Sequence, residues 1–291
     1  MAASFNLEEV GRRSDPYDVV WTPEQAILYA LGVGAGQDDP QDELSLTTQD
    51  SEGMPQEVLP TFAVWISQAG IGKRVPFGTY DRGTLVHAEQ SLRLHRPLPP
   101  SGSARATAVL EGIYDKGSGA LVDISVEAVD PVTSELLWVS RLGYFIRGAG
   151  GFGGPRGPQT STAETGSTSI PERPMDTEVR TSTRPDQALL YRLSGDFNPL
   201  HSDPAFARRA GFERPILHGL CTYGVIARTL TRTELGGDQT RFREISARFS
   251  KPVLPGEQLR TEVWREPGEL AFRTHGEDGR IVLDRGRLRH D

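Results

Sequence analysis

The chain repeats part of its own sequence, and this internal repeat limits the folds open to it more than any other feature. The segment TPEQAILYAL at 22–31 matches RPDQALLYRL at 184–193 at six of ten positions. Two further matches share a spacing of 155 residues: LPTFAVW at 59–65 with RPILHGL at 214–220, and SLRLHRPLPP at 91–100 with SARFSKPVLP at 246–255. Three matches in the same order indicate a duplicated domain.

A segment rich in Gly, Pro, Ser and Thr separates the two copies. It reads GAGGFGGPRGPQTSTAETGSTSIPERP over residues 148–174. Such a composition has almost nothing to bury and is typical of a flexible or surface-draped linker. We therefore predict an N-terminal domain over 1–147, a linker over 148–174 and a C-terminal domain over 175–291.

Each copy has the same order of predicted elements. A short helix with Pro at its first position comes first, and in the second copy Ser194-Gly195 ends it. A more apolar segment follows, and GLCTYGVIARTL at 219–230 is apolar nearly all round, as a buried helix is. Strand-like runs complete each copy: 85–96, 104–114, 120–130 and 135–147, then 244–254, 257–265, 269–276 and 280–290. The fold class is α+β, with two helix-and-antiparallel-sheet units side by side.

Composition excludes several classes of protein. The formal charge is −7, and no Lys/Arg-rich run suggests nucleic-acid binding. No apolar run approaches the ~18 residues of a membrane span, and the N-terminus lacks the apolar core of a secretory signal. The single Cys221 excludes an internal disulfide framework and favours a reducing compartment, so we expect a cytoplasmic protein.

Comparison of the two copies indicates where chemistry lies. The second copy continues from its helix with SGDFNPLHSDP at 194–204, whereas the first continues with GVGAGQDDPQDE. Likewise His218-Gly219 stands where the first copy has Ala63-Val64. Features that the fold requires should occur in both copies, so polar features found in one are better candidates for a functional site.

The residue types in this turn suit acid–base chemistry on a carbonyl compound. Asp196 and His201 could hold a water and move a proton near neutral pH, and the amide of Asn198 could orient that water. Gly219, at the start of the buried helix, could present its backbone N–H to an oxygen that gains negative charge.

Each residue also has a structural interpretation. Asn198-Pro199 is a common turn or helix-capping pair, Asp196 could close an Asx turn, His201 could be a surface histidine and Gly219 a packing glycine. We interpret His218 as structural or supporting. The remaining histidines, His87, His95, His275 and His290, have no ligand spacing, and we predict no metal.

The segment YRLSGDFNPLHSDPAFARRAGFERPILHGLCTYGV at 191–225 resembles the signature of the MaoC-like, (R)-specific 2-enoyl-CoA hydratases, or hydratase 2 enzymes. A degenerate first half followed by a complete second half is similar to their two-domain members. The resemblance implies a double hot dog fold and a hydro-lyase that converts trans-2-enoyl-CoA reversibly to (R)-3-hydroxyacyl-CoA.

The resemblance also implies roles. Asp196 and His201 would activate the water, Asn198 would position it, and the N–H of Gly219 would stabilise the thioester oxygen. No cofactor would be needed, coenzyme A being part of the substrate. The first half, without an active site, would accommodate a bulky acyl tail from fatty acid or sterol side-chain metabolism. A homodimer is the expected assembly, and a monomer the alternative.

Two further points stay open in the sequence. Four cations near the motif are candidates for the coenzyme A phosphates, or else belong to a solvated surface: Arg214, Arg248, Lys251 and Arg243. The alternative functions are a hot dog acyl-CoA thioesterase and a non-catalytic acyl-CoA-binding subunit of a larger dehydratase.

Overall fold

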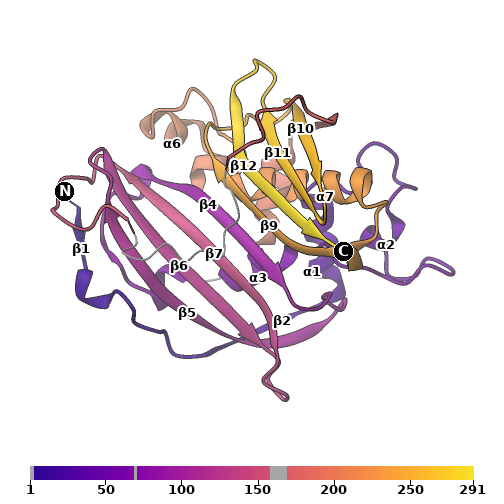
Figure 1. Ribbon diagram of the computed structural model, residues 1–291, viewed down its shortest axis with the longest axis horizontal. Helices are drawn as coiled ribbons and strands as arrows, with labels where there is room; N and C mark the ends of the chain where they lie inside the picture. The colour runs from indigo at the N-terminus through magenta and orange to yellow at the C-terminus, as the bar shows by residue number, and fades with distance from the viewer. Residues whose placement is uncertain (1–2, 69–70, 158–168) are drawn as a thin grey trace.

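The structure is a computed structural model that describes residues 3–68, 71–157 and 169–291. Its main feature is one antiparallel sheet with strand order β2-β5-β6-β7-β4-β9-β12-β11-β10-β8, and the long helix at 219–234 lies behind it in Figure 1. The first five strands in this order come from the first half of the chain and the last five from the second half.

The sheet strands of the first half are β2 (Tyr17–Trp21), β4 (Leu85–Leu94), β5 (Gly102–Asp115), β6 (Gly119–Val129) and β7 (Leu136–Arg147). Those of the second half are β8 (Thr177–Ser182), β9 (Phe242–Phe249), β10 (Gln258–Glu266), β11 (Glu269–His275) and β12 (Ile281–His290). A separate two-stranded sheet consists of β1 (Ser4–Phe5) and β3 (Gly78–Thr79).

The α-helices are α1 (Pro23–Gly32), α2 (Leu44–Thr47), α3 (Phe62–Gln68), α4 (Ile71–Arg74), α5 (Gln187–Tyr191), α6 (Pro204–Arg209) and α7 (Gly219–Glu234). The 3-10 helices are η1 (Leu7–Glu9), η2 (Arg82–Thr84), η3 (Arg192–Ser194), η4 (Pro199–His201) and η5 (Gln239–Arg241).

The two halves meet where β4 pairs with β9. Ser91 lies opposite Ser246 in this ladder, and these two residues are equivalent in the sequence repeat. The strand order reads outward in the same way on both sides of that pair, which gives the sheet a local two-fold axis. The duplication predicted from sequence is therefore a continuous sheet with approximate two-fold symmetry, and the α+β prediction is confirmed.

The first helices of the halves pack against each other across the same axis. Thr22 and Gln25 form a capping box at the start of α1, where Pro23 occupies the first helical position. The rings of Tyr29 in α1 and Tyr191 in α5, which are equivalent in the repeat, lie 6.1 Å apart between centroids. Gln187 donates a 2.5 Å hydrogen bond to the Gly32 carbonyl.

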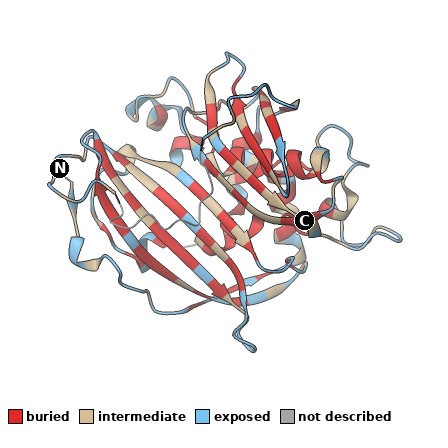
Figure 2. Cartoon of the chain, viewed as in Figure 1, coloured by how far each residue is buried: buried red, intermediate tan, exposed pale blue. Residues whose placement is uncertain are grey.

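Helix α7 is the central helix of the second half. Its residues 221–231 are all buried, and Figure 2 shows them in the buried layer behind the sheet. Tyr223 Oη donates to the Ile245 carbonyl at 2.9 Å, which fixes the helix to β9. A side chain at Gly224 would approach Tyr29 Oη and Val33 to 2.7 Å, so close packing against α1 requires glycine there. The prediction of a buried helix is confirmed.

All eight predicted strand runs are strands, whereas β2 and β8 were not predicted. These two strands are the edges of the sheet and pair on one side only. β8 contains a single apolar residue, Val179, and β2 is five residues long. β8 therefore lacks the apolar content by which a buried strand is identified. β2, YDVVW, is apolar on its buried face but is short and stands directly before the stronger helix signal of α1.

The glycine-rich segment after β7 is held against the turn between β5 and β6. The Asp115 carboxylate accepts hydrogen bonds from the backbone N–H groups of Gly117, Gly151 and Gly153, each at 2.9 Å. The ring of Phe152 packs on Phe5, with centroids 4.8 Å apart. Residues 148–157 thus lie along the surface; residues 158–168 of the predicted linker lie outside the described residues, and the domain boundaries stay a prediction.

Replacement of Asp115 by Ala should weaken the attachment of residues 148–157 to the turn between β5 and β6. The three N–H groups would lose their acceptor, which we expect to lower the urea concentration at the midpoint of unfolding. Asp115→Asn, which keeps one acceptor oxygen, should lower it less. Urea denaturation and limited proteolysis at 148–157 measure both effects. Asp50→Ala, at an exposed position, is the control, and equal stability of Asp115→Ala and this control would contradict the expectation.

Candidate active site

A cavity of about 980 Å³ lies at the junction of the two halves. It is lined by the turn after η3, by the start of α7 and by strands β4, β7 and β9. All four residues predicted to carry chemistry line it: Asp196, Asn198, His201 and Gly219. The structure thus brings together residues that the sequence comparison singled out in one copy only.

The turn that carries Asp196 is held by its own polar side chains. Gly195, with φ of 128°, ends η3 in a conformation that suits glycine. The Asp196 carboxylate accepts the Asn198 N–H at 3.1 Å, and Asn198 Oδ1 accepts the Leu200 N–H at 3.1 Å, which caps η4. The structural interpretations of Asp196 and Asn198 therefore hold, and both side chains line the cavity as well.

His201 is buried, and its hydrogen bonding fixes its tautomer. Nδ1 lies 2.8 Å from the Ile216 carbonyl oxygen, which can only accept, so Nδ1 carries the hydrogen. Burial lowers the pKa of His201, although the Ile216 carbonyl and Asp196 act in the opposite direction. The neutral ring keeps a free lone pair on Nε2, and a proton acceptor requires such an atom.

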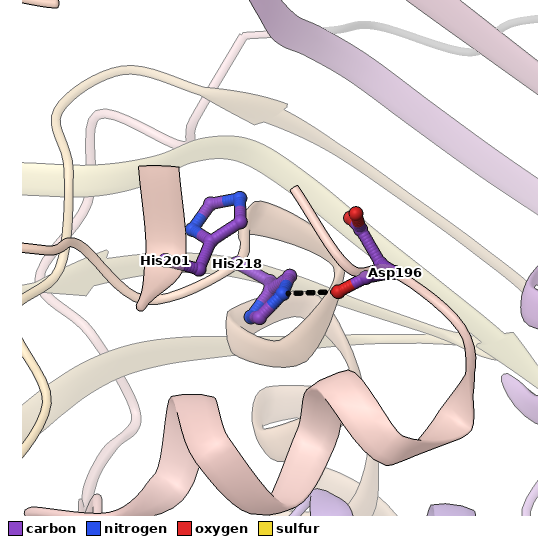
Figure 3. Close-up of side chains that lie close together, drawn as sticks. All are labelled: Asp196, His201 and His218. Carbon is purple, nitrogen blue, oxygen red and sulfur yellow. Dashed lines mark hydrogen bonds between the residues drawn. The ribbon is translucent and has the colours of Figure 1, made fainter. Parts of the chain in front are cut away.

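His218 contacts both His201 and Asp196. Its ring stacks on that of His201 with centroids 3.7 Å apart and an interplanar angle of 27°. Figure 3 shows the hydrogen bond from its Nε2 to the backbone oxygen of Asp196, which is 3.1 Å long. Sequence reasoning assigned His218 a supporting part, but it did not foresee a contact with Asp196, 22 residues earlier in the chain.

Asp196, His201 and His218 also offer metal-type ligands, because one ligand atom of each lies within 4.8 Å of the others. The geometry fits a metal poorly. A metal about 2.0–2.1 Å from a ring nitrogen lies near the plane of that ring, and the two ring planes here are stacked. One nitrogen of each ring is also engaged by a carbonyl. The absence of a metal stays a prediction.

Gly219 begins α7, and its N–H points out of the helix end. His218 is the N-cap residue and forms no side-chain cap. Within the described residues, the Gly219 N–H has no hydrogen-bond acceptor. A Cβ at this position would approach the Phe249 ring to 3.3 Å. The first turn of α7 thus offers the cavity a donor with the positive end of the helix dipole behind it.

The first half contributes two side chains that sequence reasoning missed. His87 in β4 and Tyr144 in β7 line the cavity, with ring centroids 5.3 Å apart. Burial lowers the pKa of His87 to about 4 and raises that of Tyr144 well above its ordinary value. Spacing along the chain could not find them, whereas the two-fold axis through Ser91 and Ser246 places His87 beside the second half.

The four predicted cations lie in three places. Arg248 and Lys251 line the cavity, and none of the described carboxylates forms an ion pair with either. Arg214 lines a separate surface pocket of about 540 Å³. Arg243 is paired with Asp291 and donates to the Thr240 carbonyl, so the structure does not bring it to the cavity.

Comparison with known protein families finds a matching family model for each half of the chain. Residues 167–284 match the family model of the MaoC like domain, and residues 20–148 match the MFE-2 hydratase 2 N-terminal domain. Among the described residues, no helix has the length and apolar character needed to cross a membrane.

Similar proteins cover nearly the whole chain. The 3-hydroxyacyl-thioester dehydratase Y of Mycobacterium tuberculosis is 44% identical over 99% of each chain. The enoyl-CoA hydratase ChsH3 of the same organism is 42% identical over 90% of this chain and 89% of its own. The crystal structure of a MaoC-like dehydratase from Phytophthora capsici has a TM-score of 0.83, 30% identity and 98% coverage of both chains.

A solved structure of lower sequence identity also shares the fold. A Mycobacterium tuberculosis protein described as having a double hotdog fold matches 96% of this chain and 95% of its own, with a TM-score of 0.62 and 15% identity. The prediction of a double hot dog is thereby confirmed.

The buried histidines make stability depend on pH. Burial lowers the pKa of His201, that of His87 to about 4 and that of His218 to about 2, so the unfolded chain binds more protons below about pH 6.5. Stability should therefore fall as the pH falls. Asp123, whose pKa burial raises to about 6, acts in the opposite direction.

Urea denaturation at pH 7.5 and 5.5 checks this expectation. Each histidine contributes at most about 1.4 kcal/mol over this interval, and Asp123 offsets less than one of them, so we expect a net loss of about 2–3 kcal/mol. The control His95→Gln, at an exposed position after β4, should show the same loss. Equal stability at the two pH values would mean that the folded protein binds these protons too.

Proposed function

The chain belongs to the MaoC-like family of hydratase 2 enzymes, and we propose that it adds water to trans-2-enoyl-CoA to form (R)-3-hydroxyacyl-CoA. It is a hydro-lyase, and the reaction is reversible. The observation that carries the proposal is the convergence of three groups in one cavity: the free Nε2 of His201, the Asp196 carboxylate and the unengaged N–H of Gly219.

The proposed chemistry begins with a water between Asp196 and His201. His201 Nε2 takes one proton as the water oxygen bonds to the β-carbon, and the Asp196 carboxylate accepts a hydrogen bond from the remaining hydrogen. The carboxylate also stabilises the imidazolium that forms. The Nε2 proton then passes to the α-carbon, so that water contributes OH to one carbon and H to the other, and the histidine is regenerated.

The start of α7 would stabilise the negative charge that develops on the thioester oxygen. Electrons from the double bond move onto that oxygen when the β-carbon is attacked, and the Gly219 N–H is placed to donate to it. Because the thioester itself acidifies the α-carbon, the proposed reaction requires no cofactor. Asn198, whose Oδ1 caps η4, keeps its NH₂ group for the water or for Asp196.

The substrate would lie across the junction of the halves. We assign the coenzyme A phosphates to the side of Arg248 and Lys251, both exposed and both lining the cavity. The acyl chain would lie against apolar side chains of the first half, among them Leu85, Val86 and Leu121. A cytoplasmic location and a homodimeric assembly stay predictions.

The direct test follows the absorbance of the conjugated enoyl thioester, using crotonyl-CoA and a long-chain enoyl-CoA, with a thiol reagent in a parallel cuvette. Hydration lowers the absorbance without free thiol, whereas a thioesterase releases thiol. Chiral analysis should find the (R) product. No change with either substrate would favour a binding subunit and contradict the proposal.

Asp196→Asn and His201→Ala should each lower kcat by about 10²- to 10⁴-fold, the usual contribution of a general acid–base group. Both residues lie outside the main core, so the circular dichroism spectrum should be retained. His95→Gln serves as the control. Turnover near that of the wild type in either folded variant would remove the residue from the mechanism.

Gly219 offers a test of a backbone donor. Pro fits the first position of a helix and lacks an N–H, and His218, with ψ of 135°, has the extended backbone that precedes Pro. Gly219→Pro should therefore lower kcat by about 10²- to 10³-fold. Gly219→Ala, which keeps the N–H and only crowds Phe249, should lose much less. Equal losses in the two variants would assign the effect to crowding.

A further inference from the structure

We propose that His218 is a positioning residue that holds Asp196, His201 and the Gly219 N–H in their relative places. The inference rests on the proposed function, because it concerns the groups that perform that reaction. His218 itself needs no contact with the substrate for this role.

One side chain connects three separate elements. The His218 backbone is the N-cap of α7, directly before Gly219. Its Nε2 donates to the backbone oxygen of Asp196, in the turn after η3, at 3.1 Å. Its ring lies on that of His201, in η4, at 3.7 Å. His218 therefore contacts both members of the acid–base pair and directly precedes the proposed oxyanion donor.

The ring is itself fixed in place. Tyr191 lies 5.0 Å from it between centroids, and His218 is 1% exposed. The Asp196 carbonyl can only accept, so Nε2 carries the hydrogen and Nδ1 is the unprotonated nitrogen. Within the described residues, Nδ1 is buried and has no hydrogen-bond partner. A buried polar atom without a partner costs free energy, and a purely structural residue at this position could avoid that cost.

The charge of His218 matters to its neighbour. Burial and the charges of His201 and Arg192 lower the pKa of His218 to about 2, whereas the hydrogen bond to Asp196 acts in the opposite direction. The ring is therefore neutral at any pH at which the protein works. A neutral ring stacked on His201 excludes water from one face and adds no repulsion when His201 takes a proton.

Two substitutions separate the hydrogen bond from the stack. His218→Gln can keep a donor near Nε2 but removes the aromatic ring, whereas His218→Phe keeps a ring and removes the donor. His95→Gln is the matched control, at an exposed position. Circular dichroism and thermal melting establish that each variant is folded before its kinetics are compared.

We expect both variants to lower kcat about 10- to 100-fold, since misplacement of reacting groups has effects of this size, with KM changed less than about threefold. The acidic limb of the pH profile should move up toward the ordinary histidine pKa of about 6.5 in His218→Gln, where water reaches His201, and stay in place in His218→Phe. A structural role alone would change the melting temperature but neither the kcat of the folded fraction nor the profile.

The outcomes distinguish this inference from the proposed function. If the wild type hydrates neither substrate, the proposed function fails, and the His201 pKa is then followed by NMR in the same three proteins. An upward shift in His218→Gln but not in His218→Phe would still support the positioning role. Folded variants with kcat within twofold of wild type and an unchanged His201 titration would overturn it.

Discussion

The pairing of β4 with β9 is the interaction on which the rest of the structure depends. Through it, two five-stranded units become one sheet, with Ser91 opposite Ser246 at the axis. The same contact brings β4 and β7 of the first half close to the N-terminal end of α7 in the second half. The cavity lies where these elements meet. A loss of this ladder would separate the sheet and open the site at the same time.

The two halves share a scaffold but differ in the polar residues at the start of their central helices. The central helix of the second half begins with His218-Gly219, and the equivalent residues in the first half are Ala63 and Val64, both buried. Both apolar residues belong to the hydrophobic core. The first half nevertheless contributes His87 and Tyr144 to the cavity walls, so the site belongs to the junction and not to one half.

Sequence reasoning reached the architecture because the repeat supplied an internal comparison. It predicted Asp196, His201 and Gly219 as site residues because these occur in one copy only, and the structure places all three in one cavity. It missed the two edge strands: β8 has a single apolar residue, and β2 has an apolar face but only five residues. It did not foresee the contacts of His218 or the place of His87 in the cavity wall, because both depend on tertiary structure. His218 stacks on a residue 17 positions away, and His87 lies on β4, the strand that pairs with β9 of the second half. Arg243 looked equivalent to Arg248 by sequence, but a pairing with Asp291 engages its guanidinium elsewhere.

The contact between Tyr29 and Tyr191 has a consequence for how such a chain can change. In a dimer of identical subunits, one gene would encode both rings, and every substitution would alter both sides of the contact together. In a fused chain each ring has its own codon, so one side can adapt while the other stays fixed. The same freedom extends to the cavity walls: the first half can be reshaped for a different acyl group without any change in the residues proposed to move protons.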